Sequence, residues 1–101
     1  MPQYVFDIQQ VYRKKPEDKI GSLVAEVDIE VIDQHSGRIL HKMVVPVLFH
    51  NYGVYPELSN ISSHIPSSNL RKEVYYRVRR YVKKLRPYLE VTKSWEEERE
   101  Q

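Results

Sequence analysis

Residues 70–86 constrain the fold most, because their apolar side chains recur at helical spacing. At about 100° per residue, six of them share a sector of about 120° on one side of a helix. These six are Leu70, Val74, Val78, Tyr81, Val82 and Leu85. A polar cap is available at residues 67–69, and Pro87 is expected to stop the helix after Arg86. The pattern predicts an amphipathic helix over residues 68–86 that must bury one face against another element.

The first fifty residues supply that element, since they contain three segments typical of β-strands. Residues 3–13 are rich in β-branched and aromatic types, and a proline-containing charged stretch follows them. Residues 22–32 alternate almost strictly, with apolar side chains on one face and Glu26, Asp28 and Glu30 on the other. A turn at residues 33–37 leads to a third strand at residues 38–50. Pro46 cannot donate a ladder hydrogen bond, so we expect an edge or a bulge there.

These segments predict an α+β fold, a three- to four-stranded antiparallel sheet packed against one long amphipathic helix. Residues 88–92 are a candidate fourth strand. Residues 51–68 lack periodicity and contain Gly53, Pro56 and Pro66, which indicates a long ordered loop. A chain of 101 residues holds one core of ordinary size. We expect a single domain over residues 1–93 and a frayed acidic tail over residues 94–101.

Composition narrows the setting of the protein. The chain contains no cysteine, which excludes disulfides and thiolate zinc sites and fits a reducing interior. The first residues lack the pattern of a signal peptide, and the longest apolar run, residues 43–49, is too short to cross a bilayer. We therefore expect a cytoplasmic protein that does not enter membranes.

Charge is concentrated on the predicted helix. Residues 70–86 hold eight Lys or Arg and one acid, Glu73, whereas the net charge of the whole chain is +2. Like charges at i,i+3 and i,i+4 spacing repel one another and lower the stability of the helix. A surface of mixed charge would avoid this loss of stability. The candidate nucleic-acid-binding residues are Arg71, Lys72, Tyr76, Arg77, Arg79, Arg80, Lys83, Lys84 and Arg86. If half of the eight cations contact phosphates of duplex DNA, log affinity should fall against log salt with a slope of about −3.6.

Other partners for this face stay open. It could dock on an acidic protein, as a regulator or inhibitor would, or it could simply be solvated. Tyr76 lies among the cations and could stack on a base. The acidic row of residues 26, 28 and 30 could receive the basic helix of a second copy, so we expect a homodimer.

Catalytic and metal sites find no support in the sequence. The three acids of the second strand could in principle hold a hard cation, but an exposed strand face needs polar residues in any case, and Lys42 could pair with them across strands. The histidines at 35, 41, 50 and 64 lack metal-ligand spacing. No glycine-rich phosphate loop or serine elbow occurs. We expect no enzyme activity, no catalytic residues, no metal site and no cofactor.

One segment is similar to a known family. The run His64-Ile65-Pro66-Ser67-Ser68-Asn69-Leu70-Arg71, followed by Val74 and Val78, resembles the junction leading into the C-terminal helix of the stage V sporulation protein G family. The order of long strands before it also resembles that family, whose members are small sheet-plus-helix dimers that bind DNA. The resemblance implies DNA contact for Arg71 and the helix around it.

Overall fold

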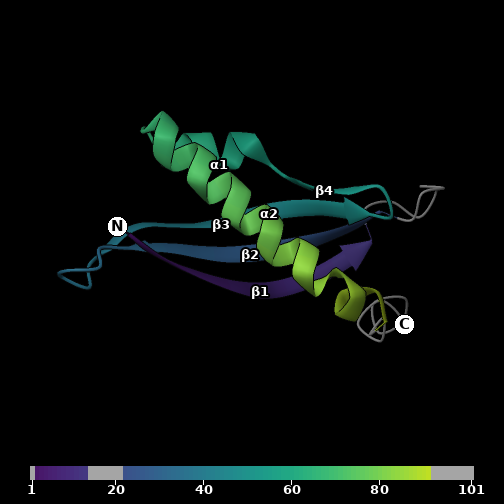
Figure 1. Cartoon of the computed structure of the whole chain (residues 1–101). Coiled ribbons are helices and arrows are strands. Elements are labelled where there is room, and N and C mark those ends of the chain that lie inside the picture. The colour runs from purple at the N-terminus through teal and green to yellow at the C-terminus, as the bar shows by residue number, and fades with distance from the viewer. Residues whose placement is uncertain (1, 14–21, 92–101) are drawn as a thin grey trace.

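The computed structural model describes residues 2–13 and 22–91, which form a four-stranded antiparallel sheet and two helices (Figure 1). Neighbouring strands follow chain order, β1-β2-β3-β4. The elements are β1 (Gln3–Arg13), β2 (Leu23–Ile32), β3 (Ile39–His50), β4 (Gly53–Pro56), α1 (Leu58–His64) and α2 (Ser68–Val91). The predicted α+β fold, its first three strands and its long helix are confirmed.

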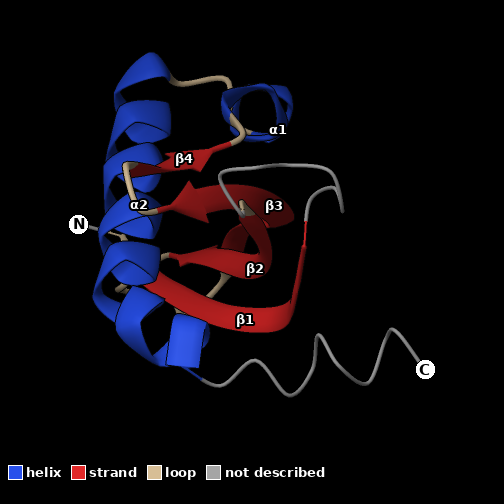
Figure 2. Cartoon of the chain, turned by 90° about the vertical axis from the view of Figure 1, so that its right-hand side faces the viewer, coloured by secondary structure: helices blue, strands red, loops and turns tan. Residues whose placement is uncertain are grey.

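One face of the sheet packs against α2, as Figure 2 shows in the end view. The apolar side chains of β2 that alternate in the sequence all lie on this face, where Val27, Ile29 and Val31 are fully buried. Val74, Val78 and Val82 of α2 are also fully buried, so the predicted apolar stripe of the helix lies in the core. Phe49 of β3 is the largest fully buried side chain. The apolar side chains that recur about every 3.6 residues in the helix and every second residue in the strand therefore form one core.

The turn between β2 and β3 follows its sequence. Gly37 has a φ of 75°, in the left-handed region that favours glycine. The Asp33 carboxylate accepts from the His35 backbone N–H at 3.1 Å and from the Ser36 hydroxyl at 2.9 Å. These two hydrogen bonds, the first being the stronger cause, hold the pKa of Asp33 below its ordinary value. The polar residues and the glycine at 33–37, from which a turn was predicted, therefore do form the turn of this hairpin.

Of the edge or bulge expected at Pro46, the bulge is wrong, because β2 and β3 keep a regular register through Glu26↔Pro46 and Val27↔Val45. The edge is confirmed, because β4 pairs with β3 only from Val47 onward. The carbonyl oxygen of Pro46 accepts from the Glu57 N–H at 3.0 Å, on the side away from β2. In a strand the nitrogen and the carbonyl of one residue point to the same side. The missing N–H of Pro46 therefore costs the β2–β3 ladder nothing, and the register shifts occur elsewhere, at Ile8/Gln10 and Val31/Ile32.

The expected loop over residues 51–68 is also wrong, since this region holds β4 and α1. β4 pairs with the end of β3, with Phe49 opposite Val54. α1 follows along the same edge of β3, where the Asn60 side-chain amide lies 3.5 Å from the Val44 carbonyl oxygen. Ile61 and Ile65 are fully buried. Both elements cover a strand edge that would otherwise be open.

Residues 88–91 are helical, so the candidate fourth strand at residues 88–92 is wrong. α2 continues through Pro87 and ends at Val91. Proline removes the hydrogen bond to the carbonyl four residues earlier, here that of Lys83. Both Lys83 and Pro87 are exposed, so water can satisfy that carbonyl. Leu89, one turn beyond Leu85, packs against the core and holds this last part of the helix in place. The predicted acidic tail lies outside the described residues.

Candidate functional site

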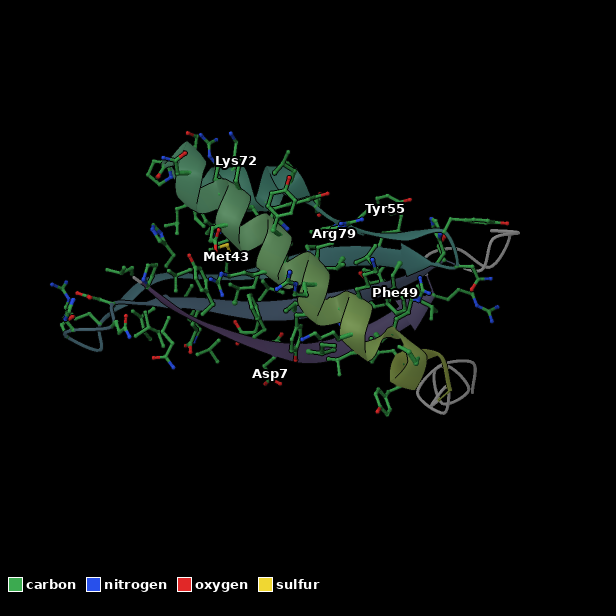
Figure 3. All side chains as sticks on the ribbon, in the orientation of Figure 1. Asp7, Met43, Phe49, Tyr55, Lys72 and Arg79 are labelled. Atoms are coloured by element: carbon green, nitrogen blue, oxygen red, sulfur yellow. The ribbon has the colours of Figure 1, made fainter. Side chains whose placement is uncertain are left out.

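The face of α2 opposite the core carries the residues that the sequence singled out. Figure 3 shows Lys72 on the N-terminal half of α2 and Arg79 farther along the helix, near β4. Lys72, Tyr76, Arg77, Arg80, Lys83 and Lys84 are exposed, and Arg71, Arg79 and Arg86 are half-buried. Their hydrogen bonds divide these cations into two groups.

In the first group, arginines fix the helix to the rest of the protein. Arg79 Nε donates to the Val54 carbonyl oxygen of β4 at 3.1 Å. Arg86 donates to the His50 carbonyl oxygen at the end of β3 at 3.0 Å. Arg71 donates to the Pro66 carbonyl oxygen, just before α2, at 3.3 Å. These three guanidinium groups complete backbone hydrogen bonding that the short β4 and the loop before α2 leave open.

Arg77 belongs to the same group, on the side of α2 that faces β1. Its Nε donates to the Glu73 carboxylate at 2.6 Å, and its guanidinium lies 4.5 Å from the centre of the Tyr4 ring. Burial raises the pKa of Tyr4, the Glu73 carboxylate raises it further, and Arg77 partly opposes them. Tyr4 therefore stays neutral at neutral pH and presents a ring face to the cation. Arg77 is exposed, but much of its charge is already balanced.

The second group is Lys72, Arg80, Lys83 and Lys84, which make no hydrogen bond or ion pair with any residue in the described part of the chain. We call them the outer cations. They span thirteen residues of α2, from 72 to 84, and the twelve steps between them cover about 18 Å at the helical rise of 1.5 Å per residue. Tyr76, with 64% of its surface exposed, lies among them. Arg80, Lys83, Lys84 and Tyr76 line one shallow groove of about 680 Å³ on this side of the helix.

These four charges, which have no partner among the described residues, are suited to a polyanion. Arg80, Lys83 and Lys84 lie within about 6 Å of helical rise, and Lys72 lies about 12 Å before them. A chain of phosphates, which follow one another at about 3.4 Å per strand in duplex DNA, is long enough to reach all four. The outer cations are four of the eight Lys and Arg residues in 70–86. Four phosphate contacts correspond to a salt slope of about −3.6 for duplex DNA. An isolated anion would meet only one or two of the outer cations.

Comparison with protein-family models, curated proteins and solved structures finds no significant match. The physical properties of the site therefore carry the functional argument.

The opposite face of the sheet carries the acidic row of β2. Glu30 lies 3.9 Å from Lys42, the cross-strand partner that the sequence suggested. Glu26 contacts the Gln10 amide, and Asp28 lies opposite Asp7 of β1. One Asp28 oxygen is buried without a hydrogen-bond partner among the described residues. The described side chains contain no group of three His, Asp or Glu arranged to hold a metal ion.

The outer cations and this acidic row lie on opposite sides of the sheet. If the basic helix of one copy docked on the acidic row of another, the two contacting surfaces would be different. Such a contact is head-to-tail and builds a ring or an open stack rather than a two-fold dimer. Among the described helices, none is long and apolar enough to cross a membrane.

Residues that the sequence reasoning missed lie beside the N-terminal half of α2. Pro56 and Leu58 face Tyr75 and Tyr76 across a second groove of about 400 Å³. They were missed because β4 and α1 were not predicted. The only sequence signal was the spacing of Ile61 and Ile65, which are four residues apart and therefore lie on one side of a helical turn.

The two groups of cations are expected to respond differently to substitution. Arg79→Met should lower the free energy of unfolding by about 1.5–3 kcal/mol, because a partly buried hydrogen bond from a charged group to the Val54 carbonyl of β4 is lost. Arg80→Met, at the adjacent position, should change it by less than about 0.5 kcal/mol, as expected for an exposed side chain without partners. Urea unfolding followed by circular dichroism measures both. Equal destabilisation by the two substitutions would contradict the division into groups.

Proposed function

We propose that this chain is a small, non-enzymatic nucleic-acid-binding protein that places the outer face of α2 on a phosphate backbone. The observation that carries the proposal is the set of outer cations, Lys72, Arg80, Lys83 and Lys84, which have no partner among the described residues and surround an exposed tyrosine. The resemblance of residues 64–78 to the helix junction of a DNA-binding family also favours it.

Two features favour nucleic acid over an acidic protein. The outer cations extend over about 18 Å of one helix, a length that a continuous phosphate backbone can follow. An exposed aromatic ring in the middle of that line adds a stacking surface for bases. The Lys and Arg side chains would contact phosphates, and Tyr76 would contact a base.

The proposal includes a cytoplasmic setting and a homodimer. The dimer rests on the resemblance of residues 64–78 to a family of small dimers and not on the acidic row of β2. The cysteine-free composition supports the setting. Size-exclusion chromatography with light scattering measures the mass in solution, and a single peak at the monomer mass of 12.1 kDa would remove the dimer from the proposal.

Fluorescence anisotropy tests the function with random-sequence single-stranded DNA, duplex DNA and RNA at 50 mM and 200 mM salt. Four phosphate contacts predict an affinity loss of about 50-fold for a single strand and about 150-fold for a duplex across this range. The absence of binding to all three probes at 50 mM salt, or binding that salt does not weaken, would contradict the proposal. The first of these results would leave an acidic protein as the partner of this face.

A further inference from the structure

The groove between α1, the end of β4 and the first half of α2 has apolar walls that reach the surface. Its volume is about 400 Å³, and Pro56, Leu58, Tyr75 and Tyr76 form its apolar lining. The rings of Tyr75 and Tyr76 meet edge to face, with centroids 5.9 Å apart and planes at 82°. Leu58 is 55% exposed and Tyr76 is 64% exposed, so much of this apolar lining is open to solvent. Open apolar walls of this kind are typical of a site that receives a flat ring.

Cations border this groove on the side of α2. Arg71 and Lys72 line it together with the two tyrosines. Arg71 uses one guanidinium nitrogen on the Pro66 carbonyl oxygen and has further N–H donors. Lys72 is one of the outer cations, and Tyr76 lines both this groove and the shallow groove that contains Arg80, Lys83 and Lys84. The apolar groove is therefore continuous with the charged line along α2.

We propose that this groove receives an unpaired base of a single-stranded nucleic acid whose backbone lies along the outer cations. The inference rests on the proposed function and adds the kind of nucleic acid. In a duplex the base faces are stacked on their neighbours and only base edges are accessible. A single strand can turn a base outward, so that its faces stack on aromatic side chains while its phosphates meet lysine and arginine.

The contacts assign a role to each wall. Tyr76 supplies the ring on which the base stacks, and Tyr75 supports that ring from the half-buried side. Leu58 and Pro56 close the groove from α1 and β4. Lys72 is placed to hold the phosphate next to the inserted base. The groove thus places an apolar surface beside a positively charged one. A nucleotide likewise has a flat base beside a negatively charged phosphate.

Binding of four matched probes by fluorescence anisotropy tests this. The probes are a thymidine strand, a uridine RNA strand, a fully abasic DNA strand and a duplex, all of twelve nucleotides per strand. The two strands that carry bases should bind about 5- to 150-fold more tightly than the abasic strand, the range expected for one stacked base. They should also bind more tightly than the duplex. Comparison of the thymidine and uridine strands shows whether the protein prefers single-stranded DNA or single-stranded RNA.

Variants locate the effect in the groove. Tyr76→Ala and Leu58→Ser should each reduce binding of the thymidine strand toward that of the abasic strand, while binding of the abasic strand stays as in the wild type. Tyr52→Ala is the matched control, because Tyr52 is 80% exposed in the β3–β4 turn and does not line the groove. Leu58 matters most here, since it lies on α1 and a base that only rested on the outer surface of α2 would not contact it.

Two results would overturn the inference. Equal, salt-sensitive binding of all four probes would mean that only phosphates are contacted, and the proposed function would still stand. Loss of base preference in Tyr76→Ala but not in Leu58→Ser would place the base outside the groove. Absence of binding by every probe would contradict the proposed function itself.

Discussion

Replacing Arg80 and Lys83 together by alanine is expected to weaken nucleic-acid binding about 25- to 60-fold at 0.1 M salt. Each phosphate contact contributes about 0.7 to the salt slope for a single strand and about 0.9 for a duplex. Losing two contacts therefore removes about 1.4 to 1.8 decades of affinity relative to 1 M salt. Both side chains are exposed and have no partner within residues 2–13 and 22–91, so the fold should be unaffected. Fluorescence anisotropy measures the change.

The chain offers a control with the same composition and the same loss of charge. Arg38 lies next to the β2–β3 turn, and the Lys42 side chain, on β3, is 63% exposed. Arg38→Ala combined with Lys42→Ala should weaken binding less than about threefold, because charges beyond the Debye length of about 10 Å are largely screened at 0.1 M salt. Equal losses in the two double variants would mean that net charge alone governs binding, and the outer face of α2 would have no special role.

Ile61→Ala is expected to lower the free energy of unfolding by about 2–5 kcal/mol. Ile61 is the only buried residue of α1 and has no exposed surface. Its removal leaves a cavity at the contact that holds α1 on the edge of β3, and small domains have only about 5–15 kcal/mol of stability in total. Urea unfolding followed by far-UV circular dichroism measures the loss.

Leu58→Ala, in the same short helix, is the control. Leu58 is 55% exposed, so its truncation should change the free energy of unfolding by less than about 0.5 kcal/mol. If Ile61→Ala unfolds at the same urea concentration as Leu58→Ala, α1 does not contribute to the core in the way described here. Detachment of α1 would also remove one wall of the proposed base groove.

The first three strands could be predicted from the sequence to within a residue, because each is long enough to show its period. In β2 the alternation from Leu23 to Val31 corresponds directly to one buried face and one polar face. β4 has only four residues, two of which, Val54 and Pro56, point to the core. A pattern that short has no period, and its pairing with β3 decides its structure.

The proline rule failed at the end of α2 for a local reason. Pro87 was expected to end the helix, but it lies on the exposed outer face, where water can replace the hydrogen bond that proline removes from the Lys83 carbonyl. Leu89, two residues farther on, packs against the core and favours continuation of the helix. The position of a proline relative to the core cannot be judged until the core itself is known.

The candidate site was only partly predictable. The sequence placed eight cations on one helix but treated them alike. Arg79 is bound to a carbonyl oxygen 25 residues earlier, on a strand that the sequence did not predict. The division between cations that fix the helix and the outer cations therefore required the tertiary structure. The same is true of the groove beside Tyr76, whose far wall comes from β4 and α1.

The outer face of α2 is proposed as the surface that contacts nucleic acid. Two-dimensional NMR of the isotopically labelled protein, titrated with a short thymidine strand at 50 mM salt, tests it most directly. We expect the largest amide shift changes on α2 between Lys72 and Lys84 and around Leu58, whereas the amides of Glu26, Asp28 and Glu30 should stay unchanged. Changes centred on the acidic row of β2, or spread evenly over the protein, would contradict it.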